Sequence, residues 1–98
     1  MSAEVSLKLI HNTSRDRFEL WDDETFMGLV GYEKDGDVYI LLHTVIEERF
    51  GQQGIARLLV SLVLTRMRLD GVRIRPVCSY VRRFLVRFPE YQLLVDHS

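Results

Sequence analysis

Short runs of alternating apolar and polar residues fill the first half of the chain. Residues 5–10 place Val5, Leu7 and Leu9 on one face, and residues 17–21 place Phe18 and Leu20 on one face. A period of two residues is typical of half-buried strands. A third strand is expected over residues 26–32, where Gly28 and Gly31 indicate a bulge or a close approach between two backbones.

Residues 38–46 are apolar on both faces of a predicted fourth strand. This pattern is typical of a central strand that is covered on both sides, so we expect helices to pack on the sheet. Asp35 and Gly36 precede this strand. An Asp-Gly pair favours a type I′ hairpin turn, because both central residues of that turn need a positive φ.

A long helix is predicted over residues 53–70. Most of its positions are Ile, Leu, Val or Met, which indicates a wide apolar stripe packed against a sheet. Polar residues three or four positions apart follow the opposite face, namely Arg57, Ser61, Thr65 and Arg68. Gly71 is placed to end the helix, since glycine readily adopts the left-handed conformation found there.

A fifth strand and a second helix are predicted after the long helix. Residues 72–77 read as a short strand, and Pro76 indicates an edge position because proline cannot donate to a ladder. A strand, a helix and a strand in succession form a crossover, so this strand should lie parallel to residues 38–46. A last helix is expected over residues 79–88, ending before Pro89.

The predicted fold class is therefore α+β. A four-strand antiparallel meander is followed by a long helix, a fifth strand parallel to the fourth, and a final helix. The length of 98 residues predicts a single domain over residues 1–98.

Composition and charge narrow the classes of function. A net charge of −1 argues against nucleic acid or an anionic membrane as a partner. Most arginines lie from Arg49 onward, which suits a phosphorylated ligand but is equally expected of a solvated surface. The sequence predicts neither a secretion signal nor a membrane-spanning stretch, and Cys78 is the single cysteine, so we expect a cytoplasmic protein.

The start of the long helix has the features of an anion site. It follows a glycine and has no acidic side chain in its first turn. Free backbone N–H groups at a helix N-terminus can bind the pyrophosphate of a nucleotide-like cofactor. Gly54 would let the backbone approach a phosphate closely.

Four motifs in order resemble one protein family. They are H-T-V-I from His43, F-G-Q-Q-G-I-A-R-L-L-V from Phe50, I-R-P-V-C-S-Y-V from Ile74, and F-P-E-Y from Phe88. Their order and spacing resemble the small single-domain branch of the GNAT acetyltransferase superfamily, an N-acetyltransferase-like family of about 90–100 residues. The resemblance extends from Arg17 to Tyr91.

The resemblance implies a sheet that splays between its fourth and fifth strands, with acetyl-CoA in the gap. The pyrophosphate would lie on the start of the long helix, and pantetheine would run beside the end of the fourth strand. The cofactor-binding residues that it implies are Thr44, Val45, Ile46, Gln52, Gln53, Gly54, Ile55 and Ala56.

Each candidate residue on the last helix has two alternative roles. Tyr80 could bind the cofactor or simply pack beneath it. Arg83, like Arg82, could contact a coenzyme phosphate or belong to a solvated helix face.

The chain departs from the wider superfamily at two positions. The pyrophosphate motif usually opens with Gln or Arg three residues before its first glycine, and here that position is Gly51. Arg49 or Arg57 could compensate. Many members also carry a tyrosine on the last helix as general acid, and the matching position here is Leu85.

Cys78 and His43 are the catalytic candidates. Cys78 begins a helix near cations, a setting that favours the thiolate form of a cysteine. The resemblance places it near the acetyl end of the cofactor, where it could accept acetyl, donate a proton to the coenzyme A thiolate, or position a group; a small buried core residue is the alternative. His43 could act as general base or be a structural histidine of the core strand.

Two functions remain open for the chain. The first is an acetyl-CoA-dependent N-acetyltransferase acting on a small amine or a protein amine. The second is a coenzyme A-binding module with weak or no catalysis. The residue types predict no metal site, and we expect a monomer or weak homodimer.

Overall fold

The computed structural model describes residues 6–51 and 54–97. A five-strand sheet has the order β1-β2-β3-β4-β5, so the strands lie side by side in chain order. The strands are β1 (Leu7–Asn12), β2 (Arg17–Asp22), β3 (Thr25–Asp35), β4 (Val38–Ile46) and β5 (Arg73–Pro76). The first four are antiparallel and β5 is parallel to β4, which confirms the predicted α+β fold.

Two α-helices and three 3-10 helices complete the fold. The α-helices are α1 (Ile55–Asp70) and α2 (Ser79–Arg87), and the 3-10 helices are η1 (Thr13–Arg15), η2 (Glu48–Phe50) and η3 (Pro89–Leu94). Gly71 ends α1 with a φ of 70°, as predicted. After η3 the chain returns to the sheet, where Asp96 N donates to Ile74 O over 2.8 Å.

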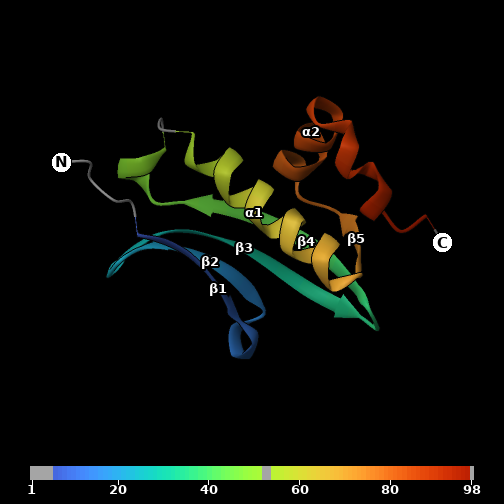
Figure 1. Ribbon diagram of the computed structural model, residues 1–98, viewed down its shortest axis with the longest axis horizontal. Coiled ribbons are helices and arrows are strands. Elements are labelled where there is room, and N and C mark those ends of the chain that lie inside the picture. The colour runs from blue at the N-terminus through green and yellow to red at the C-terminus, as the bar shows by residue number, and fades with distance from the viewer. Residues whose placement is uncertain (1–5, 52–53, 98) are drawn as a thin grey trace.

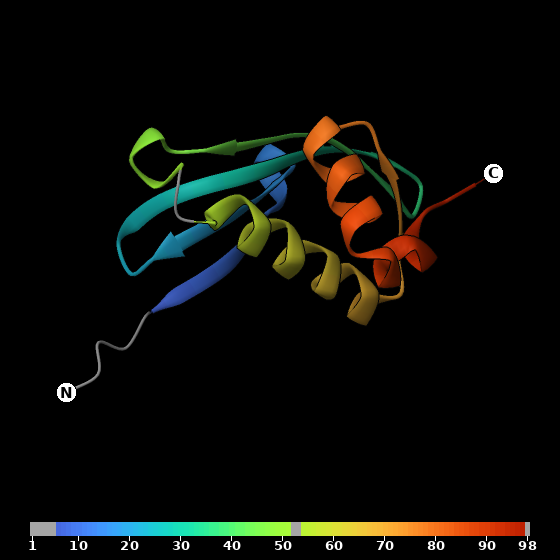
Figure 2. The ribbon, with the colours of Figure 1, turned by 90° about the horizontal axis from the view of Figure 1, so that it is seen from above.

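The helices lie on one face of the sheet (Figure 1). The helix α1 runs along the sheet, α2 lies beside it toward β5, and the view from above shows both on the same side (Figure 2). Leu59, Val63 and Leu64 of α1 are fully buried in this layer, as is Leu41 of β4. The hydrophobic core therefore lies between the helices and a single sheet face.

The other face of the sheet is exposed, so the prediction that the fourth strand is covered on both sides is wrong. His43 is exposed, and the side chains of Val45 and Ile10 are 47% and 42% exposed. Residues 38–46 were expected to be covered on both sides, but the described helices cover only one. The apolar residues on the second face of β4 are partly exposed rather than core.

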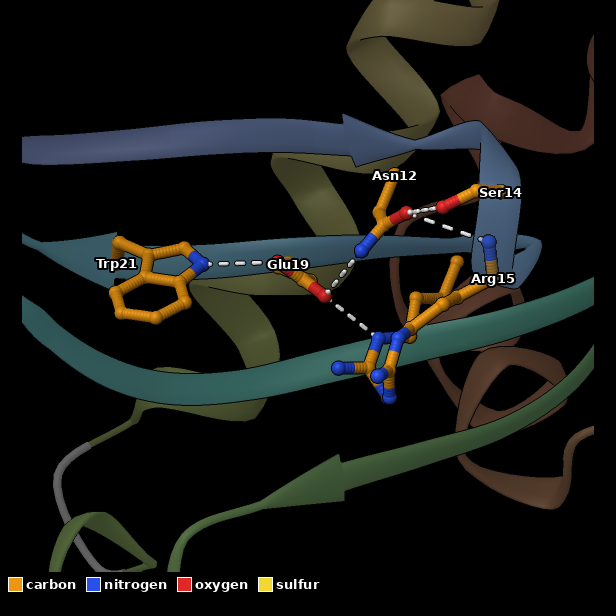
Figure 3. A network of polar contacts seen from close by, with 6 residues as sticks. Asn12, Ser14, Arg15, Glu19 and Trp21 are labelled. Carbon is orange, nitrogen blue, oxygen red and sulfur yellow. Dashed lines mark hydrogen bonds and ion pairs between the residues drawn. The ribbon is translucent and has the colours of Figure 1, made fainter.

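Glu19 organises a polar network on that second face (Figure 3). Its carboxylate accepts hydrogen bonds from Trp21 Nε1 at 3.0 Å, Arg17 Nε at 2.6 Å and Asn12 Nδ2 at 3.1 Å. Burial alone would raise the pKa of Glu19, but the three hydrogen bonds and the Arg17 charge outweigh it and lower the pKa. The network ties β1 to β2 where no helix covers them.

The turn between β3 and β4 differs from the predicted type I′ geometry. The two turn residues are Gly36 and Asp37, flanked by the paired residues Asp35 and Val38. Gly36 has a φ of 61°, and Asp37 has no positive φ. Glycine at the first centre with positive φ is the signature of a type II′ turn. The hairpin was predicted, but its turn lies one residue further along.

Candidate active site

The sheet opens between β4 and β5. Paired residues run from Val38 with Arg73 to Leu41 with Pro76. The N–H groups of Val77 and Cys78 then both donate to Leu41 O, at 3.0 and 2.8 Å, and the chain turns away into α2. The second half of β4 continues to Ile46 with no described strand on that side, as the predicted splay requires.

A bulge sets the direction of the β4 side chains at this opening. His43 pairs with Gly31 while Leu41 pairs with Tyr32, so Leu42 is an extra residue in β4. The sequence analysis placed a bulge or close approach at Gly31 but did not locate the extra residue on β4. The bulge turns Thr44 toward the helices and His43 toward the open sheet face.

Backbone groups of β4 are available at the opening. Glu47 N donates to Met27 O of β3 over 2.8 Å. Backbone groups alternate in direction along a strand, so those of Thr44 and Ile46 point away from β3, toward the edge that β5 leaves free. Val45 instead points its backbone toward β3 and its side chain into the open face.

Cys78 lies at this edge. Its side chain is buried, with 7% exposed, and it occupies the N-cap position of α2. The Sγ atom is 3.4 Å from Thr44 Oγ1, within hydrogen-bonding distance. Two candidates from distant parts of the sequence, Thr44 and Cys78, thus meet where the unpaired β4 backbone begins.

The start of α1 is an unblocked helix N-terminus. Gly54 precedes it with a φ of 69°, and there is no side-chain cap and no acidic residue in the first turn. Among the described residues, a Cβ added at Gly54 would meet nothing within 4 Å. Ile55 and Ala56 begin the helix as expected, whereas the candidates Gln52 and Gln53 lie outside the described residues.

A cationic hollow lies between the start of α1 and α2. Its volume is about 140 Å³, and its walls are Arg57, Tyr80, Arg83, Phe84, Arg87 and Phe88. A neighbouring hollow of about 360 Å³ shares Arg57, Phe84 and Phe88 and reaches Gly54. The predicted candidates Tyr80 and Arg83 are therefore adjacent to the helix start, and Arg87 joins them although the sequence analysis did not single it out. The sequence did contain a signal for Arg87: it lies four residues after Arg83, so both side chains share one face of the predicted helix.

His43 does not join Cys78. Consecutive residues of a strand point to opposite faces, so His43 lies across the sheet from Thr44. Its ring covers Gly31: a Cβ at that glycine would clash with His43 Nε2. This close approach explains the glycine that the sequence analysis noticed. The catalytic role of His43 stays a prediction.

The remaining candidates lie outside this arrangement. Arg82 is exposed, and the Arg49 guanidinium lies over its neighbour Phe50 at 4.9 Å. Leu85, at the position of the usual tyrosine, is buried in the core. Within residues 6–51 and 54–97, no three His, Cys, Asp or Glu side chains are placed to bind a metal ion. No helix there is long and apolar enough to cross a membrane.

Comparison with known proteins agrees with this architecture. None of the curated proteins compared with the chain matches it. A GCN5-like protein from Staphylococcus aureus, solved by NMR in solution, has the same fold with a TM-score of 0.68 and 23% identity over 94% of this chain and 93% of its own. The sequence profile of the GCN5-related N-acetyl-transferase family matches residues 17–94. The chain therefore belongs to the GCN5-related N-acetyl-transferase family, the superfamily that its motifs predicted.

Proposed function

We propose that this protein is an acetyl-CoA-dependent N-acetyltransferase whose reaction takes place beside Cys78. The observation that carries the proposal is the free β4 edge, which has an unblocked helix N-terminus on one side and the Cys78 thiol on the other. Membership of the acetyltransferase family supports the same reaction class.

The residues present fit coenzyme A in two respects. The bare N–H groups of Ile55 and Ala56, with no side-chain cap and no acidic residue in the first turn, suit a pyrophosphate, since a helix N-terminus attracts anions. The backbone groups of Thr44 and Ile46 suit the amides of pantetheine, which would extend the sheet at its open edge.

Acetyl-CoA, when bound, supplies an activated acetyl thioester. The backbone N–H groups at the end of β4 would polarise a carbonyl there, as in an oxyanion hole. An acceptor amine must be neutral to attack that carbonyl, forming the N–C bond as the C–S bond breaks and losing a proton from its nitrogen to solvent.

Two roles are open for Cys78. In the first, its thiol gives a proton to the departing thiolate and is reprotonated from solvent. In the second, its thiolate would take the acetyl group from acetyl-CoA as a thioester, with coenzyme A thiolate as the leaving group, and the amine would then attack that thioester and release the Cys78 thiolate. In both roles the Thr44 hydroxyl holds Sγ in place, because the two atoms are 3.4 Å apart.

Intact mass spectrometry after incubation with acetyl-CoA separates these roles. An adduct of about one acetyl group that is absent from Cys78→Ala supports the covalent role. A wild-type protein with no adduct, but with acetyl transfer that falls in Cys78→Ala, supports the proton donor. If Cys78→Ala transfers acetyl at the wild-type rate over a panel of small amines and peptides, Cys78 is not catalytic.

A non-catalytic coenzyme A-binding module is the second candidate. Leu85 favours it, because the buried leucine replaces the tyrosine that acts as general acid in many members of the superfamily. Release of coenzyme A thiol distinguishes the two functions. Binding of acetyl-CoA with no thiol release for any amine in the panel would leave only the binding module.

A further inference from the structure

The hollow beside the start of α1 gathers three arginines on aromatic rings. The Arg57 guanidinium lies 5.7 Å from the centre of the Phe88 ring, and the Arg87 guanidinium lies at the same distance from that ring. Arg83 lies 5.8 Å from the centre of the Tyr80 ring. Cation–π contacts restrain the arginine side chains, so less conformational freedom is lost when they bind an anion.

No carboxylate lines the arginine hollow itself, although Glu90 lines the neighbouring one. None of the three forms an ion pair with a described residue; the ion pairs found there belong to Arg17 and Arg75. Arg83 and Arg87 are one helical turn apart, and like charges at that spacing repel each other. A chain with a net charge of −1 therefore concentrates positive charge at one place.

We infer that Arg83 and Arg87, together with Arg57, bind the 3′-phosphate of coenzyme A and make this protein select the 3′-phosphorylated cofactor. The inference rests on the proposed function, because it concerns the same cofactor. Coenzyme A carries two separate anionic groups, the pyrophosphate and the 3′-phosphate. The structure offers two separate anion sites, the N-terminus of α1 and the arginine hollow, and the neighbouring hollow connects them.

Guanidinium groups suit this role better than a second helix N-terminus would. A phosphate monoester carries a charge of about −1.5 to −2 near neutral pH. Arginine binds phosphate oxygens through two parallel N–H groups, and such charge-assisted hydrogen bonds are stronger than neutral ones. A dephosphorylated cofactor would present only a ribose hydroxyl to three unpaired cations.

Calorimetric titration of the wild-type protein with coenzyme A and with 3′-dephospho-coenzyme A tests the inference. We expect the dephosphorylated form to bind about tenfold to a hundredfold more weakly, the usual effect of losing a hydrogen-bonded charge. Raising the salt concentration should reduce this preference, because exposed charges are screened.

A double variant, Arg83→Gln with Arg87→Gln, should remove most of the preference and leave only the contribution of Arg57. Its affinity for coenzyme A should fall close to that of the dephosphorylated form, whose own affinity should hardly change. Arg82→Gln is the matched control: Arg82 lies on the same helix and is exposed, but it does not line the hollow. The control should keep the wild-type preference, and thermal unfolding without ligand should show that all variants fold.

The outcomes separate this inference from the function on which it rests. Equal binding of the two cofactors by the wild-type protein would overturn the 3′-phosphate site and leave acetyl-CoA binding intact. Equal loss of both affinities in the double variant would also overturn it, since the arginines would then act on a part common to both cofactors. No binding of either cofactor would overturn the proposed function and the inference together.

Discussion

Glu19 is the one buried carboxylate among the described parts of the chain. Its carboxylate stays charged because Asn12, Arg17 and Trp21 surround it with donors. The network lies on the sheet face without helices, so it contributes to stability rather than to the site around Cys78.

Lowering the pH should destabilise the protein through Glu19. Because the folded state lowers the pKa of this carboxyl, the unfolded state binds more protons as the pH falls below about 4.3, the unfolded value, and the free energy of unfolding decreases. Glu19→Gln should cost about 1–3 kcal/mol at neutral pH by losing charge-assisted hydrogen bonds. It should also weaken the acid dependence. Urea unfolding at several pH values measures both effects, and an unchanged acid dependence in the variant would contradict the assignment.

His43 and Thr44 are neighbours in sequence on opposite faces of β4. We expect Thr44→Val to reduce kcat/KM for acetyl transfer about fivefold, the equivalent of one lost hydrogen bond of about 1 kcal/mol. His43→Gln should leave kcat/KM close to the wild-type value, because its ring covers Gly31 on the far face. Steady-state kinetics with one amine compares the variants, and a large loss in His43→Gln alone would reassign the chemistry to the open face.

The helix α1 carries a left-handed glycine at each end. Gly54 and Gly71 have φ values of 69° and 70°, and a Cβ at either would meet nothing within 4 Å among the described residues. A residue other than glycine would therefore be equally strained at the two positions, but only Gly54 lies at the proposed anion-binding end of the helix.

Alanine at each of these glycines separates binding from stability. Gly54→Ala and Gly71→Ala should each destabilise the protein by about 1–2 kcal/mol, because alanine disfavours positive φ. Only Gly54→Ala should weaken binding of acetyl-CoA, since its methyl group lies where phosphate would approach. Thermal unfolding and titration calorimetry test the pair, and equal weakening by both variants would argue against the α1 N-terminus as the pyrophosphate site.

The molecule as a whole holds its candidate site between three elements, α1, α2 and the end of β4. Each reaches the site from a different part of the chain, so a ligand bound there would join them. The tail is also tied back: Arg75 of β5 pairs with Asp35 at 3.0 Å and with Asp96 at 3.1 Å.

Acetyl-CoA should stabilise the folded protein. A ligand that binds only the folded state adds about 2.7 kcal/mol at a concentration 100 times its Kd. Thermal unfolding with increasing acetyl-CoA measures this effect, with the acetyl-free coenzyme as a comparison. An unchanged Tm at millimolar cofactor would contradict both the enzyme and the binding module.

The secondary structure was largely readable from the chain because its signals are local. The alternation of residues 17–21, the apolar stripe before Gly71 and the proline after α2 each act over a few residues, and the observed elements follow them closely. The crossover from β4 to β5 follows from the order of the elements, and the family resemblance supplied the splay. Cys78 and the start of α1 were also predicted, because the residues themselves carry the relevant chemistry.

Three features depend on contacts between distant parts of the chain: the faces of β4, the uncovered sheet face and the arginine hollow. Because Leu42 is an extra residue, the side chains that follow it in β4 point to the opposite faces from those that a regular strand would give. Thr44 therefore points toward Cys78, and His43 points away from it. Whether the second sheet face is covered depends on where the helices pack, which a strand pattern does not contain. The arginine hollow likewise exists only when α1 and α2 pack side by side, because Arg57 is far in sequence from Arg83 and Arg87.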